Sequence, residues 1–177
     1  MKDITSYAIG ILIAAIFSGC ATMKSGHSGV EGFDREKYLG TWYEIARFDF
    51  VFERGLNNTT AEYSLTDSET IIGVTNRGYD FKAKRWKQAV GRARFRGDES
   101  RGELEVSFFG PFWGEYAVLA LDEGYRYALV AGKKTDYLWI LSRTKTIPHD
   151  IILKYLGIAE GLGFDTDRLL WIEHDGA

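Results

Sequence analysis

The chain has 177 residues, of which 45% are hydrophobic and 27% are charged. This balance is typical of one globular domain, and it excludes collagen-like, intrinsically disordered and multi-span membrane proteins. The formal net charge of −3 lacks the basic surplus that binding to phosphate backbones requires, so nucleic acid is not expected as a partner. Aromatic residues make up 15% of the chain, and because rings favour strands and line apolar pockets, the composition favours β-structure.

The N-terminal segment has the features of a secretory signal. Lys2 precedes an apolar run over residues 7–17, which is too short for a spanning helix of roughly 20 residues but suits the apolar part of a signal peptide. The run ends in Phe-Ser-Gly-Cys, which resembles a bacterial lipobox, whose cysteine is acylated and becomes the new N-terminus. We therefore expect residues 1–19 to be a lipoprotein-type signal peptide and Cys20 to be a lipid anchor. The alternative is an ordinary signal that is cleaved elsewhere and leaves a free thiol.

The residues after the signal predict a tether and then a folded domain. Residues 20–32 are expected to be the lipidated N-terminus and a flexible tether, because the stretch is rich in Gly and Ser. Cys20 is the only cysteine, so no internal disulfide can form. Ala21, rather than Asp, follows Cys20, and its resemblance to the sorting rule of such lipoproteins implies the bacterial outer membrane, facing the periplasm. Residues 33–177 are expected to form one barrel domain.

From residue 33 onward, short segments of alternating apolar residues are separated by turn residues, which predicts an all-β domain. Eight segments are enough to close an antiparallel up-and-down barrel around one small ligand. Because successive side chains in a strand face opposite sides, Leu104, Val106 and Phe108 are expected inside the barrel, and the arginines of residues 92–96 outside it. The predicted strands cover residues 41–48, 58–65, 70–78, 86–96, 102–109, 114–121, 125–131 and 137–142.

The character of the chain changes after the last of these strands. Apolar residues recur at helical spacing over residues 147–163, with Pro148 near the start and glycines near the end, which predicts one amphipathic helix. Its apolar stripe is expected to pack on the outside of the barrel. A short strand over residues 169–173 is expected to return beside the first strand.

Three short motifs stand out in the domain, formed by Gly40 and Trp42, by Thr135, Asp136 and Tyr137, and by Arg143. They resemble the motifs of the lipocalin family in order, separation and strand context. The resemblance covers residues 33–173 and is greatest to the bacterial outer-membrane lipoprotein lipocalins, which are similar to apolipoprotein D. It implies that Trp42 closes the bottom of the barrel and that Arg143 lies across its ring, so both belong to the fold rather than to a ligand site.

Strand alternation and the same resemblance predict a ligand pocket above that floor. Rings and aliphatic side chains with an amide and some phenols would bury a hydrocarbon tail and offer a few hydrogen bonds to a polar head, as a fatty acid or lysophospholipid requires. Neither a cofactor nor a metal is expected. For each single residue, simple core packing is the alternative. The candidate pocket residues are Tyr63, Asn76, Phe108, Tyr116, Trp139 and Leu141.

Two surface features leave alternatives open. Phe50, Val51 and Phe52 follow the first strand, and they predict either an apolar lid or a membrane-touching rim over the open end, or a continuation of the strand. The basic residues of 82–96 indicate a solvated face, or else a surface for anionic lipid headgroups. A homodimer is also left open.

Other functions compete with lipid carriage. An enzyme acting on a lipid is disfavoured because the only cysteine lies at position 20 and because the three histidines, His27, His149 and His174, lie outside the predicted strands. The same scatter disfavours a zinc site and haem carriage. An envelope scaffold or stress protein that acts through protein contacts is the remaining alternative.

Overall fold

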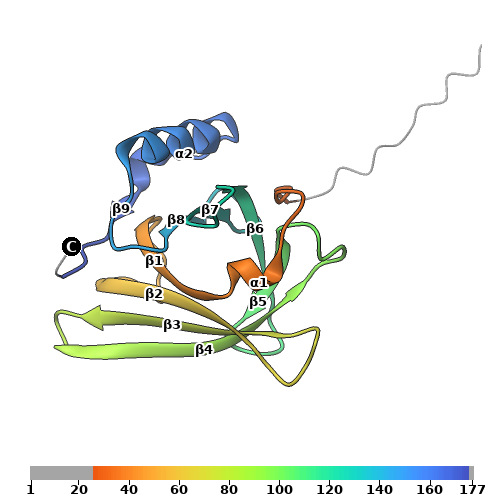
Figure 1. Ribbon diagram of the computed structural model, residues 1–177. Helices are drawn as coiled ribbons and strands as arrows, with labels where there is room; N and C mark the ends of the chain where they lie inside the picture. The colour runs from red at the N-terminus through yellow and green to blue at the C-terminus, as the bar shows by residue number, and fades with distance from the viewer. Residues whose placement is uncertain (1–25, 176–177) are drawn as a thin grey trace, which may run out of the picture.

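The computed structural model describes residues 26–175, so the predicted signal peptide and Cys20 lie outside the described residues. Eight strands form a closed ring in which each strand pairs antiparallel with the next and β8 returns to β1 (Figure 1). The predicted eight-stranded antiparallel barrel is confirmed. Its strands are β1 Gly40–Arg47, β2 Leu56–Leu65, β3 Ile72–Asp80, β4 Arg85–Phe95, β5 Glu103–Ser107, β6 Gly114–Leu121, β7 Tyr127–Ala131 and β8 Leu138–Ser142.

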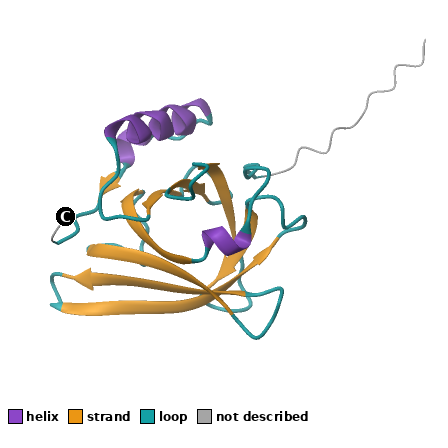
Figure 2. Ribbon diagram, in the orientation of Figure 1, coloured by secondary structure: helices purple, strands orange, loops and turns teal. Residues whose placement is uncertain are grey.

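The predicted C-terminal helix is also present and lies outside the barrel (Figure 2). This helix, α2, covers His149–Gly161 and is shorter than predicted at both ends. It begins directly after Pro148, whose carbonyl accepts hydrogen bonds from the first turn at 3.1 Å, and it ends before Gly163, whose φ of 86° breaks the helical backbone. None of the helices in residues 26–175 is long and apolar enough to cross a membrane.

The predicted return strand is found as β9, Leu170–Trp171, which follows the 3₁₀ helix η1, Thr166–Arg168. It pairs with Ala46 and Arg47 at the end of β1, beyond the last residues that β1 pairs with β2. β9 thereby covers backbone groups that would otherwise form an exposed strand edge.

Apolar residues bury two separate cores, one on each face of the barrel wall. Alternate residues of β7 divide between them, since Val130 packs inside the barrel and Leu129 packs outside under α2. Tyr155 and Ala159 of α2 are buried in the outer core. Because this part of the sheet is covered on both faces, β7 and β8 have nearly continuous apolar sequences instead of clean alternation.

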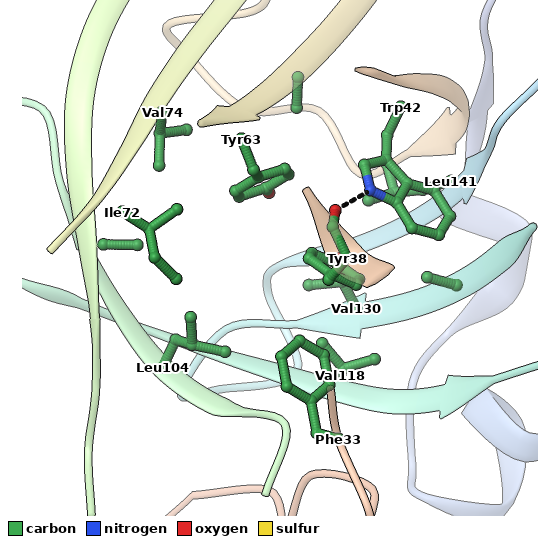
Figure 3. Close-up of a cluster of buried hydrophobic side chains, with 13 residues drawn as sticks. Phe33, Tyr38, Trp42, Tyr63, Ile72, Val74, Leu104, Val118, Val130 and Leu141 are labelled. Carbon is green, nitrogen blue, oxygen red and sulfur yellow. Dashed lines mark hydrogen bonds between the residues drawn. The ribbon is translucent and has the colours of Figure 1, made fainter. Parts of the chain in front are cut away.

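The inner core closes one end of the barrel around Trp42 (Figure 3). Trp42 is fully buried and donates a hydrogen bond from Nε1 to the carbonyl of Tyr38 over 2.9 Å. The guanidinium of Arg143 lies 3.8 Å from the centre of the indole ring, which is a close cation–π contact. The same guanidinium donates to four backbone carbonyls, those of Lys37, Tyr38, Thr41 and Tyr125.

These contacts explain a short helix that the sequence analysis did not predict. α1, Arg35–Tyr38, crosses the closed end of the barrel (Figure 1). Asp34 accepts a hydrogen bond from the backbone N–H of Lys37 at its N-terminus, and Arg143 satisfies carbonyls at its C-terminus. Gly40 follows with a φ of 91° that favours glycine, which gives the glycine of the first motif a backbone reason.

The last residues of the predicted tether are attached to the barrel. Val30 donates a backbone hydrogen bond to Val118 over 2.8 Å and accepts one from Gly102 over 2.9 Å. Glu31 forms a β-bridge and an ion pair with Arg101. The prediction of a flexible tether therefore does not hold for residues 29–31, because their backbone groups find partners at the closed end of the barrel.

Candidate ligand-binding site

The barrel is hollow above the Trp42 floor. An inner cavity of about 310 Å³ and an outer cavity of about 450 Å³ meet each other, since they have several wall residues in common. Each volume falls in the range of small-molecule sites in proteins. The shared wall residues are Glu44, Phe50, Glu53, Asn76, Val106, Phe108 and Gly114.

All six candidate pocket residues line the inner cavity. They come from five strands of the ring or their ends, and strand alternation points them to the same interior. Two of them, Asn76 and Phe108, also line the outer cavity. The other four are Tyr63 of β2, Tyr116 of β6, and Trp139 and Leu141 of β8.

Three phenols are linked at the lower end of this cavity. Tyr63 donates to the hydroxyl of Tyr116 over 2.8 Å, and the hydroxyls of Tyr116 and Tyr38 are 2.6 Å apart. Burial raises the pKa of each phenol well above its ordinary value, so all three stay neutral. The three hydroxyl groups carry three hydrogens, and their two mutual hydrogen bonds use two of them. The third hydrogen can therefore be donated to another acceptor.

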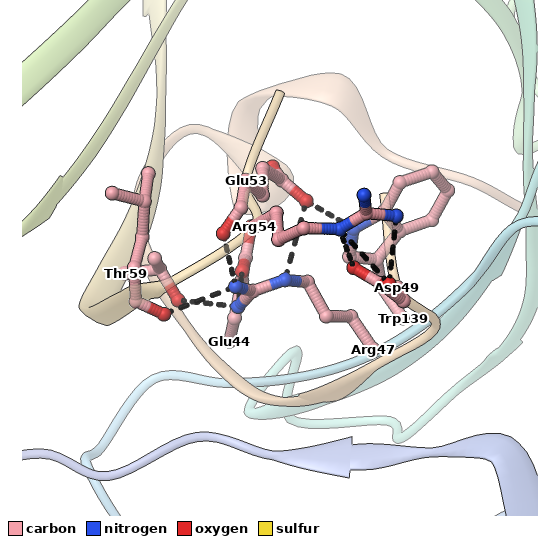
Figure 4. A network of polar contacts seen from close by, with 8 residues as sticks. Glu44, Arg47, Asp49, Glu53, Arg54, Thr59 and Trp139 are labelled. Atoms are coloured by element: carbon pink, nitrogen blue, oxygen red, sulfur yellow. Dashed lines mark hydrogen bonds and ion pairs between the residues drawn. The ribbon is translucent and has the colours of Figure 1, made fainter. Parts of the chain in front are cut away.

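A buried charged network lies along the same wall, and the sequence analysis did not predict it (Figure 4). The Arg47 guanidinium contacts a Glu44 carboxylate oxygen at 3.1 Å and a Glu53 carboxylate oxygen at 3.6 Å. It also donates to the backbone carbonyls of Glu53 at 2.6 Å and Leu56 at 3.0 Å, and to the hydroxyl of Thr59 at 3.3 Å. Arg47 therefore holds the β1–β2 loop to the end of β1.

The two carboxyl groups of this network face the cavities, whereas Arg47 is absent from the walls of both. Burial, followed by the nearby Glu44 carboxylate, raises the pKa of Glu53 to about 8, although Arg47 acts in the opposite direction. The indole N–H of Trp139 points to Glu53 Oε2 over 3.3 Å. The hollow thus has a mostly apolar wall with an acidic, hydrogen-bonding stretch on one side.

The Phe-rich loop lies at the open end of the barrel. Residues 51–55 form turns, so the expectation that the loop continues the strand is wrong. Phe50 lines both cavities and packs against Tyr137 and Trp139, with ring centres 5.3 and 6.4 Å away. Val51 and Phe52 are more than 60% exposed, and Phe52 contacts Phe109 across the opening. The loop therefore forms part of the rim, where Phe50 lines both cavities and Phe52 borders the outer cavity alone.

The second motif lies beside this rim. Thr135 and Asp136 are exposed in the turn before β8. Tyr137 is 39% exposed, lines the inner cavity and stacks on Trp139 with 10° between the ring planes. Tyr137 is therefore both a motif residue and a cavity residue, and only the first of these roles was expected.

The basic residues of β4 point outward as expected. Arg92 and Arg94 are exposed residues of β4 and lie opposite Ser107 and Glu105 of β5, whereas Arg96 directly follows β4. Arg94 contacts Glu105 and lies 4.2 Å from the ring centre of Trp113, while Arg96 contacts Glu115 at 3.0 Å. This pairing is typical of a solvated face.

The histidines lie outside the hollow. His27 packs against Phe164, and His174 forms a hydrogen bond of 2.8 Å with the backbone carbonyl of Glu44. His149 is the first residue of α2. Within residues 26–175, no group of three or more His, Cys, Asp and Glu side chains is arranged to hold a metal ion.

A model of the lipocalin-like domain matches residues 33–174. The chain belongs to the lipocalin family. This lipocalin is 51% identical to the outer membrane lipoprotein Blc of Citrobacter freundii over 156 residues, which cover 88% of each chain. It is 49% identical to the outer membrane lipoprotein Blc of Escherichia coli (strain K12), again over 88% of each chain. Apolipoprotein D of Mus musculus is 33% identical over 78% of this lipocalin and 76% of its own length.

Solved structures show the same fold at lower sequence identity. Insecticyanin from the tobacco hornworm superposes on this lipocalin with a TM-score of 0.67 at 21% identity, covering 85% of this chain and 88% of that one. Lobster apocrustacyanin A1 gives a TM-score of 0.66 at 16% identity and covers 81% of both chains. The barrel with one packed helix is therefore the family fold.

Proposed function

We propose that this lipocalin is an outer-membrane lipoprotein that stores or transports a hydrophobic ligand, such as a fatty acid or a lysophospholipid, in the bacterial cell envelope. The observation that carries this proposal is the hollow of the upper barrel, with its inner cavity of about 310 Å³ above a closed floor. Rings and aliphatic groups dominate its wall, so an alkyl chain gains free energy by leaving water for it. The family is one of binding proteins, so the expected activity is binding rather than catalysis.

The membrane location rests on the relatives and on the N-terminal sequence. Relatives at 49–51% identity are outer membrane lipoproteins. Cys20, after an apolar signal and ahead of a short segment leading into the barrel, is the residue that would carry the lipid anchor. Two or more acyl chains hold a protein firmly to a bilayer, whereas one holds it weakly. The anchor would keep the barrel close to the membrane from which a lipid ligand comes.

Uptake of a fluorescent fatty acid by the purified protein tests the proposed function. Ala61 is buried and lines the inner cavity, so Ala61→Trp should fill the hollow and weaken uptake at least tenfold. Val90 is 66% exposed, so Val90→Trp adds the same ring at a solvent-exposed site and should leave uptake unchanged. Circular dichroism of both variants establishes that the barrel is folded. Equal uptake by folded Ala61→Trp and the parent would refute carriage in the hollow and favour the scaffold alternative.

A further inference from the structure

We propose that the hollow contains a subsite for a primary ammonium group, formed by Glu44, Glu53 and Asn76, so that this lipocalin prefers amine-bearing amphiphiles to those with an anionic head. This inference rests on the proposed function, because it specifies the head of a ligand whose tail fills the same hollow. The three residues line both cavities, and they therefore surround the place where the two cavities meet.

The acidic side chains on the wall of the hollow outnumber the cation that is paired with them. Glu44 and Glu53 are 3% and 8% exposed, and within residues 26–175 Arg47 is the one cation that forms ion pairs with them. One guanidinium compensates one carboxylate. Because a buried charge without a partner is costly, the second carboxyl group must hold a proton or meet a further cation.

The other cationic side chains near the hollow already have acidic or aromatic partners. Lys87, on the outer cavity, contacts Asp80 at 2.7 Å, and Lys133, on the inner cavity, is 3.8 Å from Glu115. Arg77 lies over the ring of Trp86 at 5.4 Å. The Glu44–Glu53 pair is therefore the place in the hollow where a ligand cation adds a missing partner.

The second feature of the proposed subsite is a buried hydrogen-bond acceptor that has no partner within the described residues. The side-chain oxygen of Asn76 is buried and has no hydrogen-bond partner within residues 26–175. It lines the same two cavities as the carboxyl groups. An ammonium group has three N–H donors and no acceptor, so it can satisfy the amide oxygen and the carboxylates together. A carboxylate or phosphate monoanion placed beside these two carboxyl groups would supply no further cation, and it would be repelled by whichever of them is ionised.

Displacement of the neutral probe N-phenyl-1-naphthylamine at pH 7 tests the subsite with ligands of one chain length. Dodecylamine should displace the probe at a concentration at least tenfold lower than dodecanoic acid, with dodecanol between them. Glu53→Gln and Glu44→Gln should each reduce this preference to less than threefold. Glu105→Gln removes a carboxylate from the outer face, where Glu105 contacts Arg94, and should keep the full preference.

The outcomes separate the subsite from the proposed function. If the probe binds and the three dodecyl compounds displace it equally, the subsite is refuted and the hollow remains a general apolar site. If neither the probe nor any of these compounds binds, the proposed function fails as well. Where dodecylamine is preferred, lauroyl lysophosphatidylethanolamine and lauroyl lysophosphatidylglycerol are compared to distinguish the source of the amine. Tighter binding of the phosphatidylethanolamine form than of the phosphatidylglycerol form indicates a lipid headgroup. Equal binding of these two lipids, with dodecylamine still preferred, indicates a free alkylamine.

Discussion

Trp42 illustrates how one side chain connects the family motif to the stability of the barrel. Its ring is fully buried, its N–H is bonded to Tyr38, and its face is covered by Arg143. Trp42→Ala should therefore lower the free energy of unfolding by about 3–5 kcal/mol, as other large core truncations do. Trp86 is 53% exposed, and Trp86→Ala should cost much less. Urea unfolding measures both changes, and equal midpoints for Trp42→Ala and the parent would contradict this role.

Glu53 makes stability depend on pH in a direction that can be worked out. Its pKa in the folded protein is about 8, mainly because of burial, compared with 4.5 for the free side chain. The folded state therefore keeps a proton that the unfolded state releases, and the free energy of unfolding falls as the pH rises from about 4.5 to about 8.

Glu53→Gln should remove most of this dependence, because glutamine resembles the protonated acid and cannot ionise. Thermal unfolding at several pH values between 5 and 8, within the window set by the two pKa values, measures the difference in stability between the parent and the variant. The variant should gain stability relative to the parent as the pH rises. Curves that stay parallel across the window would show that Glu53 is ionised throughout.

The charged network also shows why the sequence predicted only part of the site. Alternation from Trp42 places Glu44 inside, but a carboxylate next to a strand motif usually faces solvent. The pairing of β1 with β8 shifts between Glu44 and Ala46, and this irregularity turns Arg47 inward as well. Strict alternation would place Arg47 outside. Five of the six predicted wall residues lie within strands, and Phe108 directly follows β5, so strand alternation together with the family resemblance located them.

Among the helices and strands, the boundaries that the sequence predicted best are those marked by turn residues, rather than those marked by apolar patterning alone. β6 begins and ends where predicted, because Gly114 and the turn after Leu121 bound it clearly. α1 was not predicted, since its four residues carry no helical periodicity and its ends are satisfied by Asp34 and by Arg143, which is distant in sequence. Tertiary partners of this kind leave no local signal.

The packing of β4 against β5 connects strand geometry to the shape of the hollow. A Cβ atom at Gly91 would lie 2.6 Å from the carbonyl oxygen of Ser107 and 2.7 Å from a ring carbon of Phe108. Gly91→Ala should therefore displace the Phe108 ring, which lines both cavities, and should weaken fatty-acid uptake severalfold with a loss of stability of about 1–3 kcal/mol.

Gly157→Ala supplies the matched control, because a Cβ atom at this position in α2 meets nothing within 4 Å. Alanine should stabilise the helix by about 0.5–1 kcal/mol and leave uptake unchanged. Thermal unfolding and fluorescence titration distinguish the two substitutions. Unchanged uptake by Gly91→Ala would mean that Phe108 is not part of the ligand wall.

At the scale of the whole molecule, the barrel divides into an end that is packed and an end that is open. Trp42 fills the first end (Figure 3), and Arg143 covers its ring. α1 crosses the same end, and α2 packs on the outer wall (Figure 1). Stability and binding therefore depend on different residues of the same strands. Substitutions at the floor should lower stability first, whereas substitutions around the hollow should alter binding first.

Native mass spectrometry of the full-length protein, extracted from its own membrane, shows directly whether the hollow carries a lipid. Carriage in the hollow predicts that each barrel holds one amphiphile and that the folded Ala61→Trp variant, whose added ring occupies the inner cavity, holds none. Lipid bound equally by the parent and by this variant, or barrels that remain empty after exposure to fatty acids and lysophospholipids, would contradict it.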